Sequence, residues 1–479
     1  MIQSAVVRVQ SGLGLGDRSA QVVAWGSLAI VGVTVAISTR FSVQVQVLGL
    51  VAALFAFLAS LRWPLLPLLG FAVLIPIEEA VVLGQLGSLS RYAEILFIVA
   101  YGLPRLGRLA VTAMPAAGWA YVGWAMFSIT WAIDPLVTIQ ELPILGLLFT
   151  MAVLVAAFVV EHPTIVRPVL WAYSLAATVT AAIGILAYLR GDVTADRVAA
   201  LPGQDPAHYA ALLLPALVFA IYELLAGRWI LVASVMAMAS TAGIVVSGTR
   251  GAWVSAAVVV ALYLLPRLDP IRRIVAVGIV AILLGLTLQL PGVSALITER
   301  TDSALASGGA GRTDIWSVGL LIYASTPING VGLDNFPVAY TPELIRESGV
   351  TTIAPWRPAF RSPHNIIIGT LGELGTIGLA LLGLFLLPLL RRRGWGPDAS
   401  MIQAVLASLC MMALFLDLLN RKEIWLVLGL ASGLALLARR DRLAAAREAV
   451  PVASDAPSSR PRGLARGDPA GSPAPGPAT

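Results

Sequence analysis

His364 is the residue of this chain whose type and position point most directly to chemistry. It is one of three histidines in 479 residues, follows Arg361 at the end of a long connection, and opens a long apolar stretch. A neutral imidazole at such a boundary can accept a proton near physiological pH. We therefore interpret His364 as a candidate general base. Of the other two histidines, His162 is expected in a solvated turn, and the sequence assigns no role to His208.

Arginines are the second candidate set, because a guanidinium binds phosphate oxygens through two parallel charge-assisted hydrogen bonds. Arg250 stands in the segment SGTRGAW, whose small residues let a large anionic group approach the guanidinium. Arg197 and Arg312 lie in the two long connections of the chain. These three arginines predict a site for a lipid-linked pyrophosphate. Arg346 and Arg357 are interpreted as snorkelling or solvated side chains.

Several carboxylates lie inside or beside apolar stretches, where a charged residue is by default interpreted as functional. They are Glu78, Glu79, Glu94, Glu373 and Asp417. Ion pairing is an adequate alternative for some of them, since Asp417 lies within one helical turn of Arg421. The sequence leaves both explanations open.

The elements that carry these residues are membrane spans. Hydrophobic residues make up 58% of the chain and charged residues 12%, whereas a soluble domain carries about 25% charged residues. Apolar blocks of about 17 to 27 residues, long enough to cross a roughly 30 Å hydrocarbon core, recur along the chain. A single cysteine, Cys410, excludes a disulfide scaffold. The net charge of +6 comes from arginines in short loops. This distribution indicates which loops are cytoplasmic and does not form a nucleic-acid-binding surface, so no nucleic-acid partner is expected.

We predict an all-α polytopic transmembrane helix bundle of about twelve to fourteen spans. The candidate spans are 21–38, 43–60, 64–84, 91–104, 113–131, 138–159, 168–188, 208–226, 229–246, 251–266, 274–290, 364–390, 401–418 and 423–438. The first is expected to be retained as a signal-anchor. Arginines gather in alternate short connections, which places those connections and both termini in the cytoplasm.

The same pattern divides the chain into five parts. They are a cytoplasmic N-terminus (1–20), a bundle (21–290) with a smaller outer connection (189–207), a large outer connection (291–363), C-terminal spans (364–438) and a disordered cytoplasmic tail (439–479). The large connection is expected to contain short helices. One is the segment 313–325, where Ile315, Trp316, Leu320 and Tyr323 recur near helical spacing.

These segments resemble the O-antigen ligase and O-antigen polymerase-like family of polytopic membrane proteins. SPHNIIIGTLGELGTIG (362–378) is similar to the family pattern, with His364, Asn365, Gly375 and Gly378 at its defined positions. Segments 197–210, 247–253 and 311–336 resemble further parts of the family in the right order. Ala207 departs from it, because Asn is usual there. The resemblance covers about 190–385.

The resemblance implies a glycosyltransferase in the plasma (inner) membrane, with its active site facing the periplasm or cell exterior. Such an enzyme moves a glycan from an undecaprenyl-pyrophosphate carrier to a hydroxyl of a lipid-anchored or glycan acceptor, as in lipopolysaccharide or other polysaccharide biosynthesis. It implies that His364 is the base and that Arg197, Arg250 and Arg312 bind pyrophosphate, with Asn365, Asn335 and Arg361 as supporting residues. No cofactor is expected, and neither a DxD metal motif nor a phosphate-binding GxxxxGK loop occurs in the sequence.

Two other classes of function stay open. A transporter or flippase of lipid-linked saccharides would be expected to place charges and broken helices near the bilayer midplane and to show repeats. The ionisable residues here collect mostly at the predicted outer edge, which favours the transferase. A structural scaffold leaves the arginines and His364 unexplained. The motifs do not separate a ligase from a polymerase.

The topology predicts that the connection 291–363 faces away from the cytoplasm. In a variant with Cys410 replaced, a cysteine introduced at Ser307 should react with a membrane-impermeant maleimide added to intact cells or spheroplasts. Labelling that requires permeabilisation of the membrane would contradict the topology and the function that depends on it.

Overall fold

The computed structural model describes residues 57–80, 88–107, 111–191, 198–201, 204–306, 312–349, 361–391 and 397–448. Within these ranges the chain forms helices and loops and no strand, which confirms the all-α class. Met1–Ala438 is one compact unit, and the second unit, Arg439–Thr479, is described only as far as residue 448. The predicted span 21–38 and most of 43–60 lie outside the described residues.

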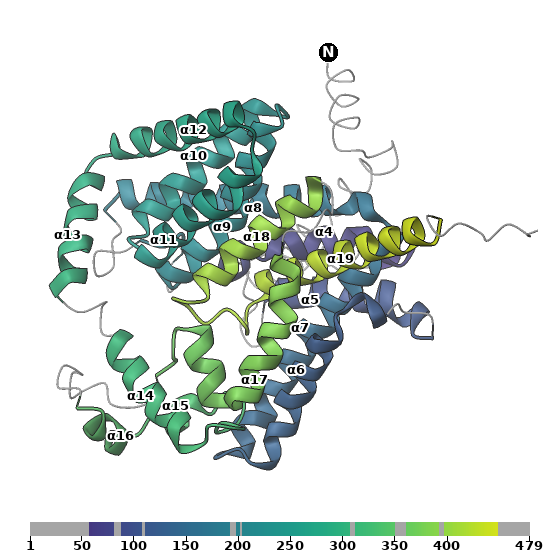
Figure 1. Ribbon diagram of the computed structural model, residues 1–479. Helices are drawn as coiled ribbons and strands as arrows, with labels where there is room; N and C mark the ends of the chain where they lie inside the picture. The colour runs from purple at the N-terminus through teal and green to yellow at the C-terminus, as the bar shows by residue number, and fades with distance from the viewer. Residues whose placement is uncertain are drawn as a thin grey trace, which may run out of the picture. The chain divides into compact units, whose positions relative to one another are not determined.

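Most helices before the large connection follow the predicted spans (Figure 1), but the span 64–84 is wrong in length, because the helix there ends at Leu74 and a turn and a short 3-10 helix (Glu78–Ala80) follow. The α-helices of this part are α4 (Leu65–Leu74), α5 (Leu89–Phe97), α6 (Ala116–Phe127), α7 (Pro135–Glu161), α8 (Val166–Leu189), α9 (Pro206–Leu225), α10 (Ile230–Val246), α11 (Arg250–Val259) and α12 (Pro270–Leu288). Helices α5 and α11 continue as single π-helical turns, at Ile98–Gly102 and Val260–Leu264.

The large connection and the C-terminal part are helical too. They contain α13 (Val293–Ala306), α14 (Arg312–Ser325), α15 (Phe336–Ala339), α16 (Pro342–Glu347), α17 (Ile366–Leu390), α18 (Pro397–Met412) and α19 (Lys422–Glu448). The tail that was predicted to be disordered from 439 therefore begins as helix. Its Ala, Leu and Arg residues are strong helix formers, which explains why α19 continues.

Three long helices begin with the same local device, an Asp-Pro pair. The carboxylates of Asp134, Asp205 and Asp269 each accept a backbone hydrogen bond from the first turn of the helix that follows. Proline fits the first helical position because its missing N–H is one of the donors that a helix start leaves unpaired. The Asp-Pro pair at each position thus determines where α7, α9 and α12 begin.

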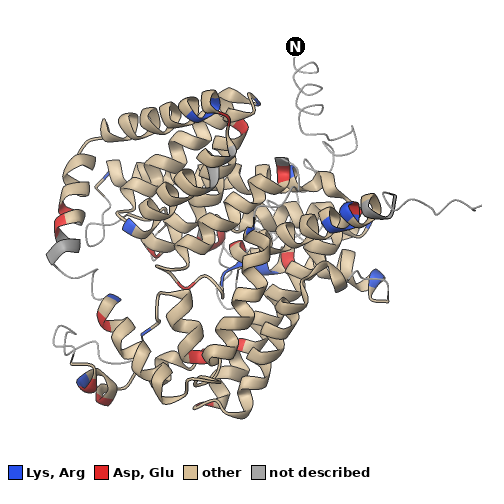
Figure 2. Cartoon of the chain, in the orientation of Figure 1, with Lys and Arg blue, Asp and Glu red and all other residues tan. Residues whose placement is uncertain are grey.

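Five described helices are long and apolar enough to cross a membrane, and four shorter apolar helices accompany them. Little of α12 is buried, and Ile271 and Ile274 on it are 76% and 74% exposed. Such a surface is unfavourable in water and suits lipid. Figure 2 shows that most of the length of the helices is neither acidic nor basic. The described chain is therefore a polytopic membrane bundle.

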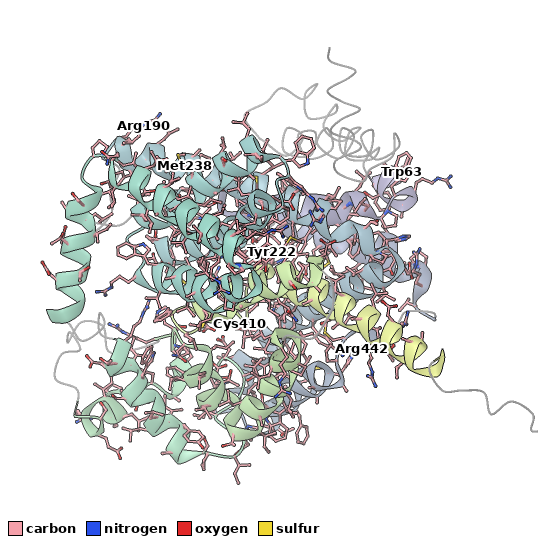
Figure 3. The ribbon with its side chains drawn as sticks, turned by 45° about the horizontal axis from the view of Figure 1, so that its top comes forward. Trp63, Arg190, Tyr222, Met238, Cys410 and Arg442 are labelled. Atoms are coloured by element: carbon pink, nitrogen blue, oxygen red, sulfur yellow. The ribbon has the colours of Figure 1, made fainter. Side chains whose placement is uncertain are left out.

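The described bundle is packed by a large apolar core, and polar contacts also link its helices. Tyr222 on α9 donates a hydrogen bond to the Ser400 carbonyl on α18 at 3.1 Å. Cys410, also on α18, is half-buried, in agreement with a packing role (Figure 3).

Helix α17 is broken at Gly375, whose φ of 67° and ψ of −166° are not helical. The predicted span 364–390 is confirmed as α17, but Gly375 divides it into two helical segments (Figure 1). Glycines recur every third residue here, at Gly369, Gly372, Gly375 and Gly378, but they do not all serve helix packing. Gly372 does lie against Phe336, but Gly375 supplies the left-handed backbone of the break.

The large connection fills the break. Val331 N–H donates to the Gly372 carbonyl at 2.9 Å, Gly332 N–H donates to the Glu373 carbonyl at 2.8 Å, and Thr376 N–H donates to the Pro327 carbonyl at 2.9 Å. Backbone groups that the break removes from the helix ladder therefore find partners in the connection, as an apolar environment requires.

The predicted helix 313–325 is confirmed as α14, but its buried face differs from the prediction. Ile315, Val318 and Ile322 are buried and form a small core with Phe336. Leu320, which was expected on the apolar face, is 50% exposed. Apolar residues occur on both sides of this helix, so spacing alone did not identify the packed side.

The break predicts that Gly375 tolerates no side chain. An alanine Cβ there would overlap the Ile328 carbonyl, and its φ is unfavourable for L-residues. We expect Gly375→Ala to lose more than about 2 kcal/mol of stability and to lower the unfolding midpoint of the purified protein.

Gly383→Ala on the same helix is the matched control, because its Cβ would meet only Leu387, at 4.0 Å. Equal unfolding midpoints for the two variants would contradict the structural account of the break.

Candidate active site

A polar cavity of about 230 Å³ lies beside His364. Its polar lining residues come from four separate parts of the chain and are Asp205, Asp334, Ser362, His364, Glu373, Asp417, Asn420 and Arg421. The segment 413–421, which joins α18 to α19, provides one wall. The start of α17 provides another.

Hydrogen bonds hold the start of α17 against the segment 413–421. Ile366 N–H donates to the Ala413 carbonyl at 2.8 Å, and Ser362 donates to a carboxylate oxygen of Asp417 at 3.0 Å. Asn365 caps the helix, since its Oδ1 accepts from the first two N–H groups after Ile366, and its Nδ2 donates to the Leu414 carbonyl at 3.1 Å. This cap fixes the start of α17 against the segment 413–421.

His364 lies in this docked segment with an unusual backbone. Its φ of 47° is left-handed, which is uncommon for a residue other than glycine. Its Nδ1 is buried and makes no hydrogen bond to the described residues. Burial lowers the pKa of His364 below the usual histidine value, the charge of Arg312 lowers it further, and Asp417 and Asp205 oppose the shift. The ring is therefore neutral at pH 7 and able to accept a proton.

The predicted arginines differ in how closely the structure relates them to His364. Arg312 starts α14, Arg361 lies three residues before His364, and the charges of both act on its pKa. Arg250 starts α11, where Thr249 donates to the Pro206 carbonyl at 3.1 Å. Arg197 lies outside the described residues.

The starts of α9 and α17 adjoin the cavity, and the start of α11 packs beside its walls. Pro206 follows the lining residue Asp205, and Gly251 of α11 lies against Phe415 of the segment 413–421. A helix start carries partial positive charge. Here Asp205 and Asn365 cap the first N–H groups of α9 and α17, and the cavity lining places four carboxylates beside Arg421.

Asn335 is fully buried and does not line the cavity. Its Oδ1 accepts from Asp134 N–H at 2.7 Å, and its Nδ2 donates to Thr138 at 2.9 Å. These bonds fix the loop that carries Asp334, whose pKa is raised by burial and by the charge of Asp417. Asn335 thus holds in place a loop of the cavity wall.

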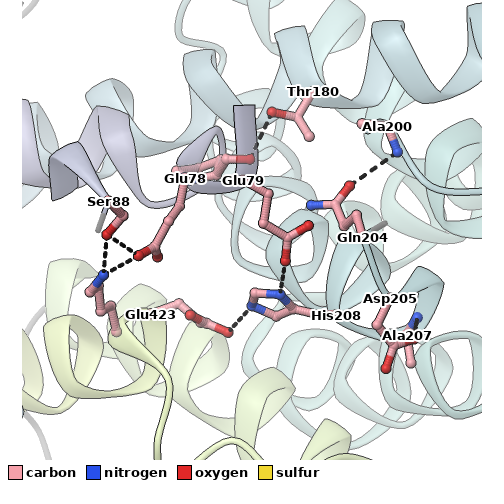
Figure 4. A network of polar contacts seen from close by, with 12 residues as sticks. Glu78, Glu79, Ser88, Thr180, Ala200, Gln204, Asp205, Ala207, His208 and Glu423 are labelled. Carbon is pink, nitrogen blue, oxygen red and sulfur yellow. Dashed lines mark hydrogen bonds and ion pairs between the residues drawn. The ribbon is translucent and has the colours of Figure 1, made fainter. Parts of the chain in front are cut away.

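A second polar network, centred on His208, was not anticipated. Figure 4 shows His208 between Glu79 and Glu423, with ring nitrogen to carboxylate distances of 3.3 Å and 3.1 Å. Lys422 forms an ion pair with Glu78, so the pairing alternative for that carboxylate is confirmed. The one available signal was that Lys422, the only lysine, adjoins Glu423 at the end of an apolar block.

Residues 233–383 match a family model described as O-antigen ligase. The matched range contains His364, Arg250, Arg312, Arg361, Asn335 and Asn365. Arg197 and the lining residues Asp205, Asp417, Asn420 and Arg421 lie outside it. No curated protein matches the chain.

Proposed function

We propose that this chain, which belongs to an O-antigen ligase-like family of membrane glycosyltransferases, transfers a glycan from an undecaprenyl-pyrophosphate carrier to an acceptor hydroxyl. The observation that carries the proposal is the setting of His364. Its ring has a nitrogen without a hydrogen bond to the described residues, lines a polar cavity and lies where helix starts and the charges of Arg312 and Arg361 meet.

In the proposed step His364 takes the proton of the acceptor hydroxyl. The acceptor oxygen forms a bond to the anomeric carbon of the glycan while the bond from that carbon to the phosphate oxygen breaks. The electron pair of the broken bond leaves with undecaprenyl pyrophosphate. Arg250, Arg312 and Arg197 are proposed to stabilise the charge that develops on it. The step uses the protein's own side chains and no nucleotide.

The cavity is proposed to face the periplasm or cell exterior from the plasma membrane. The starts of α9, α11 and α17 all belong to connections that the arginine pattern places on the outer side. The start of α11 contacts the start of α9, and the start of α17 contacts the outer segment 413–421. These contacts support that pattern, because segments assigned to opposite sides of a membrane would not meet.

The transporter alternative is favoured by one observation, the broken helix α17, since transporters form their sites with discontinuous helices. Here the break is filled by the segment 327–332, whereas the cavity lies at the start of the helix, beside His364. The surface glycans of a deletion strain separate the functions. Unattached polymer on the carrier indicates a ligase, single repeats indicate a polymerase, and donor retained on the cytoplasmic side indicates a transporter.

Replacing His364 by alanine should leave a folded protein with little transfer activity. A positioned base contributes about 10² to 10⁴ in rate, so we expect a loss of that size in purified protein with saturating donor. His162→Ala, in a solvated turn, is the matched control. If His364→Ala kept most of the wild-type rate, His364 would not be the base, and the role would fall to a carboxylate such as Asp417.

The lowered pKa of His364 also sets a pH dependence. Because the base must be neutral, wild-type turnover should hold at pH 6.5, the usual pKa of histidine, and should fall only at lower pH. A fall that is already complete above pH 6.5 would be inconsistent with this environment of the ring.

Arginine-to-lysine changes test the pyrophosphate site, because lysine keeps the charge but loses the bidentate fork. Arg250→Lys and Arg312→Lys should slow transfer and weaken inhibition by inorganic pyrophosphate by about tenfold. Arg346→Lys on α16, whose exposed side chain pairs with Glu343, is the control. If pyrophosphate inhibits all three variants and wild type alike, the two arginines do not form the site.

A further inference from the structure

A second and larger cavity, of about 540 Å³, lies beside His208. Asn420 and Arg421 line it and also line the cavity at His364, so the two spaces adjoin through the segment 413–421. The step proposed above uses none of the other residues of the second cavity. Its walls come from the connection after α4, from α5, from α7, from α9 and from the start of α19.

Part of the wall is fixed by polar contacts within the protein. His208 is 5% exposed and bridges Glu79 and Glu423 (Figure 4). Lys422 pairs with Glu78 and donates to Ser90 at 2.6 Å. These contacts join α9, α5 and α19 and hold the charged groups in place.

Other groups in the wall lack such partners. Glu94 is 0% exposed, and neither of its carboxylate oxygens accepts a hydrogen bond from the described residues. Oε2 of Glu79 and Nε of Arg421 are likewise buried without a hydrogen-bond partner there. Leaving such groups unpaired is costly, so a ligand that supplies hydrogen-bond donors to the carboxylates is favoured.

The charges of the wall indicate the chemical class of that ligand. Five glutamates line the cavity together with the cations Arg91, Arg421 and Lys422. A sugar hydroxyl both donates and accepts, and therefore suits a wall that mixes carboxylates with cations. Ile144 and Leu147 of α7 line the same cavity and offer an apolar surface for the C–H face of a sugar ring. The described residues contain no cluster of His, Cys, Asp and Glu suited to a metal ion.

We propose that the second cavity binds a neutral saccharide, namely the sugar of the acceptor that presents its hydroxyl to His364. The identity of this saccharide as the acceptor rests on the proposed function, whereas the cavity and its unpaired Glu94 do not. The pyrophosphate and the acceptor sugar then occupy adjoining spaces on either side of Asn420 and Arg421. Glu94 is a binding residue in this account and takes no part in the chemical step.

The test is Glu94→Gln, which keeps the shape of the side chain and removes its charge. Full-length protein in lipid nanodiscs is titrated calorimetrically with dephosphorylated oligosaccharide that mild acid has released from the host's own surface glycan. We expect affinity to fall by roughly tenfold or more, the loss typical of a hydrogen bond to a charged group. Inorganic pyrophosphate should bind Glu94→Gln as it binds wild type. Glu161→Gln, at the opposite end of α7, is the matched control.

Steady-state kinetics of Glu94→Gln distinguish whether the cavity binds the acceptor sugar or the donor sugar. A raised KM for the acceptor with an unchanged KM for the donor supports the proposal, and the reverse pattern overturns the acceptor assignment. Saccharide affinity that Glu94→Gln leaves unchanged also overturns the proposal. If Glu94→Gln does not fold, Leu147→Phe, which narrows the cavity without changing a charge, takes its place with the same expected results.

The two proposals fail in different ways. If Arg250→Lys binds pyrophosphate like wild type while Glu94→Gln loses saccharide, the proposed function fails and the saccharide site stands. If Arg250→Lys loses pyrophosphate affinity while Glu94→Gln binds saccharide like wild type, only the saccharide site is refuted.

Discussion

The hydrogen bonds between the start of α17 and the segment 413–421 are the contacts on which the candidate site depends. The first N–H groups of a helix have no partner within it, and lipid offers none. Here the Asn365 side chain and the Ala413 carbonyl supply these partners. The same contacts hold His364 in its left-handed conformation at the cavity wall. Without them neither the orientation of His364 nor the wall formed by Asp417 would be defined.

A second constraint follows from the apolar composition. Charged groups can gather only where the helices end or are interrupted, because a charge that faces lipid is costly. The two cavities lie at such places, at the starts of α9, α17 and α19, and they meet at Asn420. The break at Gly375 serves the same arrangement, since it brings the segment 327–332 and the loop of Asp334 against α17. The large connection therefore forms part of the site.

The sequence predicted what depends on local patterns. Apolar blocks located the described helices, and motif context singled out His364, Asn365 and Arg250. Spacing failed where the structure depends on a single backbone angle, as at Gly375, because a glycine repeat does not report φ.

The sequence also missed contacts between distant segments. Glu79 and Glu423 lie 129 and 215 positions from His208, so no local spacing relates the three side chains. Such a network becomes visible only when packing brings α9 beside the start of α19.

The central claim, that the helix starts and arginines around His364 form one pyrophosphate and transfer site, is tested most directly by a cryo-electron microscopy structure in lipid nanodiscs. The ligand would be a non-reactive analogue of the undecaprenyl-pyrophosphate glycan. The account predicts the pyrophosphate within hydrogen-bonding distance of Arg250 and Arg312, with the anomeric carbon facing the His364 ring. Density for the pyrophosphate on another face, with the cavity at His364 empty of ligand, would contradict it.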